Sequence, residues 1–96
     1  MSPNDLPPGW VGTDARHYME IVGGFRMKVT GDGVDYHDQK YRWSLWATAA
    51  AFRLLYGDPA GFDTAAIARA DGLAAVETFA RKMMEQAAQL RAKETA

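Results

Sequence analysis

Few residues in this chain have the type and spacing that catalysis requires. The two histidines, His17 and His37, lie in different segments, and Ser44 lacks the glycines that flank a nucleophilic serine. The glycine-containing stretches at residues 31–33 and 57–61 lack the further glycine, the lysine and the helix start that hold a phosphate. The sequence therefore predicts a protein without enzymatic activity and without a cofactor.

One acidic loop carries side chains that can bind a cation. His37 lies close in sequence to Asp32, Asp35 and Asp38, and the oxygen and nitrogen atoms of such side chains bind divalent metal ions. Their spacing matches no calcium-binding loop, and acidic residues are also what a solvated loop normally contains. We therefore expect no metal site here.

The side chains best suited to binding belong to one face of a predicted sheet. Five residues alternate with apolar ones along extended segments, with no acidic residue at an equivalent outward position: Arg26, Lys28, Arg42, Trp46 and Arg53. Basic side chains neutralise phosphates, and an exposed indole can stack on a base. This face is a candidate nucleic-acid surface. The alternative is a solvated face whose basic side chains cover Trp46.

Alternating apolar residues predict the strands that carry this face. Apolar and polar side chains alternate over residues 25–30 and again over residues 41–48, which indicates two strands with one apolar side each. The inward residues would be Phe25, Met27, Val29, Tyr41, Trp43, Leu45 and Ala47. The turn at residues 31–33 and a polar loop at residues 34–40 would join the two strands.

A further strand is predicted at residues 16–22, where apolar residues occur on both faces of the extended segment. Gly23 and Gly24 separate it from Phe25. Two glycines between extended segments favour a hairpin turn, and the alternative is a bulge within one long strand. The first reading gives a four-stranded meander and the second a three-stranded one.

Residues 47–56 also leave two readings open. The segment is rich in helix formers and precedes Gly57 and Pro59, which together favour a short helix. The alternation that places Phe52, Leu54 and Tyr56 inward favours a strand instead, although residues 48–51 contain no typical turn residue.

A long amphipathic helix is predicted over residues 64–92, with Asp63 as its N-cap. Its apolar stripe recurs at spacings of three and four, as Leu73, Val76, Ala80, Met83, Ala87 and Leu90. Gly72 is a position where the helix either bends or packs closely.

This helix is longer than the sheet that it covers. It would span roughly 43 Å, whereas strands of six or seven residues cover about 20–23 Å. The apolar residues nevertheless continue through Met83, Met84, Ala87 and Leu90. Either the N-terminal arm with Trp10 folds back over them, or they form a surface for a partner or for a homodimer.

Together these elements predict an α+β fold: an antiparallel three- or four-stranded β-meander packed against one long C-terminal α-helix. Residues 1–15 are expected to form a flexible arm, because three of the four prolines lie within residues 1–9. Residues 16–92 form a single domain, and residues 93–96 a frayed tail. A chain of 96 residues with 48% hydrophobic content is sufficient for one core.

Charge and composition exclude few partners. A net charge of −1 gives no overall attraction to nucleic acid or to anionic membranes, and the absence of cysteine excludes disulfides. The first eight residues lack the basic start and apolar core of an export signal, and no segment approaches the roughly 20 apolar residues of a membrane helix. We expect a cytoplasmic protein without membrane contact.

The sequence therefore predicts a small non-catalytic protein-binding module. In size and in its lack of catalytic groups and targeting signals it is similar to accessory and inhibitor proteins of phages and mobile elements, including anti-defence proteins, although no motif carries that comparison. The alternative is a nucleic-acid-binding module that uses the basic outer face of the sheet.

Overall fold

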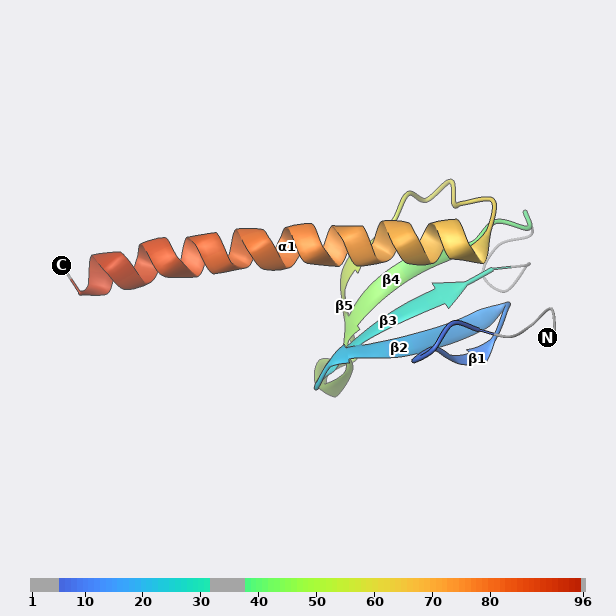
Figure 1. Ribbon diagram of the computed structural model, residues 1–96, viewed down its shortest axis with the longest axis horizontal. Coiled ribbons are helices and arrows are strands. Elements are labelled where there is room, and N and C mark those ends of the chain that lie inside the picture. The colour runs from blue at the N-terminus through green and yellow to red at the C-terminus, as the bar shows by residue number, and fades with distance from the viewer. Residues whose placement is uncertain (1–5, 32–37, 96) are drawn as a thin grey trace.

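The computed structural model describes residues 6–31 and 38–95. A five-stranded antiparallel sheet is covered on one face by a single long helix (Figure 1). The strands lie in chain order: β1 (Val11–Thr13), β2 (Arg16–Val22), β3 (Phe25–Thr30), β4 (Arg42–Ala47) and β5 (Phe52–Tyr56), followed by α1 (Ala65–Glu94). The predicted α+β class is confirmed, with five strands instead of three or four.

The additional strand lies in the segment that was predicted to be a flexible arm. β1 pairs with β2, with Val11 opposite Tyr18. Trp10 packs against the core and meets the ring of His17 edge-on at 5.2 Å. Residues 1–5 of the arm lie outside the described residues, as do Asp32, Asp35 and His37 of the acidic loop.

Gly23 and Gly24 form the hairpin turn between β2 and β3, so the hairpin interpretation is confirmed. Gly24 has a φ of 91°, a conformation that side chains with a Cβ rarely adopt. A register shift between Glu20 and Val22 adds a bulge just before the turn.

Residues 52–56 form a strand, but its inward residues differ from those predicted. A short 3-10 turn at Thr48–Ala50 reverses the chain, and Ala51 completes the turn in a left-handed conformation. A register shift at Leu45 and Trp46 then lets Leu55 pair with Leu45 and face the helix. The prediction that Tyr56 faces inward is therefore wrong, because the bulge at Leu54 displaces the alternation by one residue, whereas Phe52 lies on the predicted side.

The core forms between the centre of the sheet and the first half of α1. The predicted strand faces are confirmed here, since Met27, Val29, Trp43 and Leu45 are all buried. Across from them, Ala65 and Ala68 are the buried apolar residues of the helix. Small helix residues let the backbone of α1 approach the large side chains of β3 and β4 closely.

Gly72 packs closely rather than bending the helix. A Cβ at this position would lie 2.9 Å from two ring atoms of Trp43 and 3.1 Å from the Met27 sulfur. The Trp43 indole is held there because its Nε1 donates a hydrogen bond to Asp71 Oδ2 at 2.8 Å. The sheet and the helix are thus joined through one indole ring.

The N-cap of α1 is Thr64 and not Asp63. Thr64 has extended backbone angles, and its side-chain oxygen accepts a hydrogen bond from the Ile67 N–H at 3.1 Å. Asp63 instead forms an ion pair with Lys40, whose ammonium group lowers the pKa of the Asp63 carboxyl group. The helix therefore begins one residue later than predicted, and the predicted cap residue takes part in a long-range ion pair instead.

Only the first half of α1 lies on the sheet (Figure 1). Burial along the helix ends at Val76, and every residue from 77 to 95 is exposed. The molecule is 56 Å long but only 26 and 23 Å across, and its radius of gyration is 15.8 Å, compared with roughly 12–13 Å for a compact chain of this length.

Candidate binding surfaces

The first candidate surface is the exposed part of α1, residues 77–94, which we call the projecting segment. Its first residues still border the sheet, since Thr78, Phe79 and Lys82 line a hollow with Leu55 of β5, and the rest extends beyond it. The projecting segment holds all the helix residues predicted to form a partner or dimer surface. Met83, Met84 and Leu90 are exposed by 54%, 72% and 58%, and Ala87 is exposed as well. Phe79 adds a half-exposed aromatic ring that the predicted surface did not include.

The described part of the N-terminal arm does not cover this segment. Trp10 packs beside His17, and the Arg69 guanidinium lies 5.9 Å from its ring centroid, so the arm contacts the first half of α1. Within the residues that the structure describes, the apolar side chains of the projecting segment therefore face solvent.

The projecting segment continues the side of the helix that faces the sheet. Ala68, Gly72 and Val76 lie on that side, and Met83 and Leu90 follow Val76 at intervals of seven residues. The apolar stripe thus leaves the core without a change of direction.

The end of the sheet below this stripe is also apolar. Cross-strand pairing aligns Val22, Phe25, Ala47 and Phe52 in one row on the helix-facing side. The three large side chains of this row are exposed. Within the described residues, the helix-facing side therefore has two exposed apolar surfaces, one on the helix and one on the sheet.

The second candidate surface is the opposite side of the sheet. Register places Arg26, Trp46 and Arg53 directly across from one another on β3, β4 and β5. Lys28, Ser44 and Tyr56 form the next row. All five predicted outer-face residues thus lie on this side, and Tyr56 joins them because of the β5 bulge.

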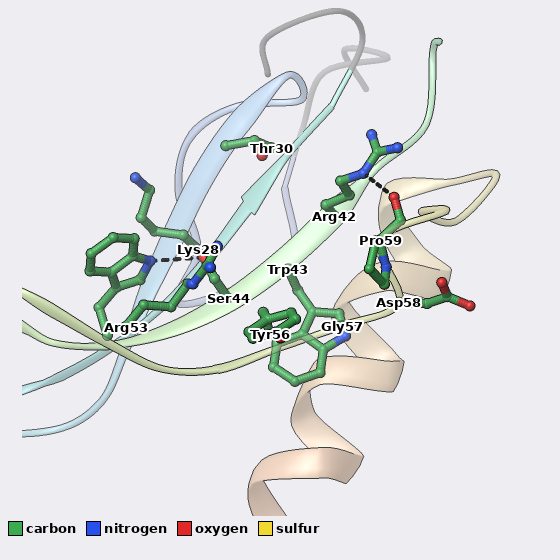
Figure 2. Close-up of a pocket in the computed structure, with 11 residues that line it drawn as sticks. Lys28, Thr30, Arg42, Trp43, Ser44, Arg53, Tyr56, Gly57, Asp58 and Pro59 are labelled. Carbon is green, nitrogen blue, oxygen red and sulfur yellow. Dashed lines mark hydrogen bonds between the residues drawn. The ribbon is translucent and has the colours of Figure 1, made fainter. Parts of the chain in front are cut away.

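A groove of about 630 Å³ crosses part of this outer face, and Figure 2 shows the side chains around it. Lys28, Arg42, Trp46, Arg53 and Tyr56 line it together with Pro59 and its neighbours. Arg26 lies outside the groove. Two of the groove's cations lie close to aromatic rings: Lys28 Nζ is 5.4 Å from the Trp46 ring, and the Arg53 guanidinium is 4.6 Å from the Tyr56 ring.

The outer face is less basic than the sequence indicated, because carboxylates pair with two of its four cations. Arg26 donates to Glu20 at 2.8 Å, and Arg42 donates to both carboxylate oxygens of Asp38 at 3.2 and 2.6 Å. The hydrogen bonds from Arg42 lower the pKa of Asp38 to about 2. The expectation of a face without acidic partners is therefore wrong. Glu20 lies on β2, and Asp38 lies before β4, so neither belongs to the strands on which that expectation was based.

Lys28 and Arg53 are the two cations of this face without a carboxylate partner in the described part of the chain. Trp46 between them is oriented by a hydrogen bond from its Nε1 to Ser44 Oγ at 2.8 Å. Two positive charges and two aromatic rings therefore line the groove, together with the paired Arg42 and the acidic residue Asp58.

A buried histidine connects β2 to α1, a role that the sequence did not reveal. His17 is fully buried, its Nδ1 lies 2.9 Å from the Thr13 carbonyl oxygen, and its Nε2 lies 3.1 Å from Arg69 Nη1. Because a guanidinium can only donate, Nε2 accepts and the proton resides on Nδ1. Burial lowers the pKa of His17 below its ordinary value of 6.5, and the Arg69 charge lowers it further.

Comparisons of this chain with models of protein families, with curated proteins and with solved structures found no match. Among residues 6–31 and 38–95, no three His, Asp or Glu side chains are grouped to hold a metal ion. Over the same residues, no helix is both long and apolar enough to cross a membrane.

Proposed function

We propose that this protein is a small non-catalytic protein-binding module, and that the projecting segment of α1 binds a helix of another protein chain. The observation that carries this proposal is the apolar stripe that continues past the sheet. Phe79, Met83 and Leu90 extend the line of the core residues, yet in the described chain Phe79 remains 37% exposed and the other two more than half exposed.

The energetics favour association over an isolated helix. The segment makes few contacts with the rest of the described chain, and its ion pair of Glu77 with Arg81 is exposed and therefore weak. Full burial of a Leu, Met or Phe side chain contributes about 1.5–3 kcal/mol. Covering the exposed parts of Phe79, Met83 and Leu90 would therefore supply several kcal/mol to a complex.

Met83→Glu tests whether the segment is a binding surface. In a monomer the new carboxylate faces water, so the melting temperature in dilute solution should stay close to that of the wild type. In a complex the carboxylate would be buried without a partner, so association should be lost. Ala92→Glu introduces the same charge on the opposite side of the helix and should leave association intact. Thermal melts and light scattering measure the two effects.

A large fall in the melting temperature of dilute Met83→Glu would overturn the proposal. It would mean that the stripe belongs to the core of the monomer and is covered by the chain itself.

A second candidate function is the binding of single-stranded nucleic acid in the outer-face groove. Lys28 and Arg53 favour it, because both lie beside an aromatic ring and neither has a carboxylate partner in the described chain. Replacing either residue by Ala should reduce the salt dependence of binding by about one phosphate contact, whereas Arg26→Ala should change it less. Absence of a gel shift with single-stranded probes at low salt would exclude this candidate.

A further inference from the structure

We propose that the partner of the projecting segment is a second copy of this chain, and that the two segments pack antiparallel with Met83 of each copy opposite Ala87 of the other. This inference rests on the proposed function, because it requires the segment to be a helix-binding surface. It specifies the partner, the direction and the register.

The sizes of the residues in the stripe distinguish a parallel from an antiparallel pair. In heptad notation, Ala80 and Ala87 occupy a positions, and Met83 and Leu90 occupy d positions. A parallel pair in register would stack alanine on alanine and large residues on large ones. An antiparallel pair places every a residue opposite a d residue.

In the proposed register, each of the four layers contains one small and one large side chain. Ala80 faces Leu90 of the second copy, Met83 faces Ala87, and the same two contacts repeat across the dyad. Layers of equal volume fill the space between two helices evenly and let their side chains interdigitate. The order of residues in the stripe therefore favours the antiparallel direction.

The charged residues beside the stripe also favour an antiparallel pair. In an antiparallel pair the e positions of the two helices face each other, and here they are Glu77, Met84 and Arg91. Glu77 comes within reach of Arg91 of the second copy, and the dyad repeats this contact with Met84 between the two pairs. A parallel pair would set e positions against g positions, and its contacts within the segment would be Phe79 with Met84 and Gln86 with Arg91. Neither contact pairs opposite charges, and Lys93, the third g residue, would face a position outside the segment. The Glu77–Arg81 pair of the free chain is exposed and can give way.

The shape of the molecule also leaves room for a second copy. The stripe faces the same side as the sheet, so a second helix bound to it lies in the layer of the sheet, beyond the sheet end seen in Figure 1. Residues 77–94 span roughly 27 Å, which is the full overlap of the two segments. The C-terminal turn of the second helix then approaches the exposed row of Val22, Phe25 and Phe52. Each copy thereby covers both apolar surfaces of the other.

Single cysteines can determine the direction and register, because the chain contains no native cysteine. One variant carries Ala80→Cys and the other Leu90→Cys; both positions are exposed in the monomer, so folding should be unaffected. A disulfide forms only when the two Cα atoms approach within about 7 Å. The two variants are mixed under reducing conditions and then oxidised, each variant alone is oxidised in parallel, and the mass of the wild type is measured by light scattering.

The inference predicts a dimeric wild type and a disulfide-linked dimer in the mixture, while each variant alone remains unlinked because identical positions lie about ten residues apart along the axis. Cross-linking of each variant with itself would overturn the antiparallel direction. A dimeric wild type without cross-links in the mixture would overturn the register. A wild type that stays monomeric at high concentration would overturn the second copy as partner. A large fall in the dilute melting temperature of Met83→Glu would separately overturn the proposed function.

Discussion

Gly72→Ala probes the contact that joins the helix to the sheet. Alanine is favoured over glycine within a helix by about 1 kcal/mol, so at an uncrowded position the substitution would stabilise the protein. Here the new methyl group would lie 2.9 Å from two ring atoms of Trp43, whereas carbon atoms prefer separations of about 3.5–4.0 Å.

The ring cannot move away without further cost. Its Nε1 is bonded to Asp71, and on another side the backbone of Gly57 is so close that a Cβ there would lie 2.4 Å from the same nitrogen. Overpacking of a tight core costs about 1–3 kcal/mol, and the gain in helix propensity offsets only part of it. Because the methyl group would meet both the Trp43 ring and the Met27 sulfur, we expect a cost in the upper part of that range. The net loss is then about 1–2 kcal/mol, which corresponds to roughly 4–15 °C in melting temperature for a domain of this size.

Thermal and denaturant melts of Gly72→Ala measure this loss. Ala74→Gly, at an exposed position of the same helix, reports the propensity effect without the clash. Combining Gly72→Ala with Trp43→Phe should cost less than the sum of the two single substitutions, because the smaller ring relieves the overlap. A Gly72→Ala protein that melts at or above the wild-type temperature would refute the close-packing account of this glycine.

Two further predictions concern the core and its pH dependence. Trp43→Ala should destabilise the protein by about 3–5 kcal/mol, and Trp46→Ala on the outer face should cost far less; the reverse order in denaturant melts would contradict the two sheet faces. Because the folded protein holds His17 neutral beside Arg69, the unfolded chain takes up its proton first as the pH falls. Stability should therefore be fully present above pH 6.5 and decline below it, down to the lowered pKa. His17→Gln should flatten this decline in melts at several pH values, and an unchanged slope would show that other groups cause it.

Local alternation was sufficient to predict the two central strands. In β3 and β4 the apolar residues Met27, Val29, Trp43 and Leu45 recur every second position, and each strand is buried on one side only. The pattern therefore determines which side faces the helix. The length mismatch between sheet and helix was also visible in the sequence, because it follows from the rise per residue alone.

Features that depend on contacts between distant segments could not be predicted in this way. The bulge in β5 follows from its pairing with β4 and moves Tyr56 to the outer face. The pairing of Glu20 with Arg26 depends on the register between two strands. Asp63 forms an ion pair with Lys40, and Thr64 is the N-cap of the helix. Each of these contacts changes a local pattern that, read alone, indicates a different arrangement.

Amide hydrogen exchange across residues 77–94 tests most directly whether a second copy of the chain covers the projecting segment. Deuterium uptake is followed for the wild type and for Met83→Glu at the same high concentration, with the peptides of β3 and β4 as an internal reference. We predict slow exchange of the segment in the wild type and fast exchange in Met83→Glu, with equal exchange of the strands in both, because only association protects a helix that the sheet does not cover. Equal exchange of the segment in the two proteins would contradict the account.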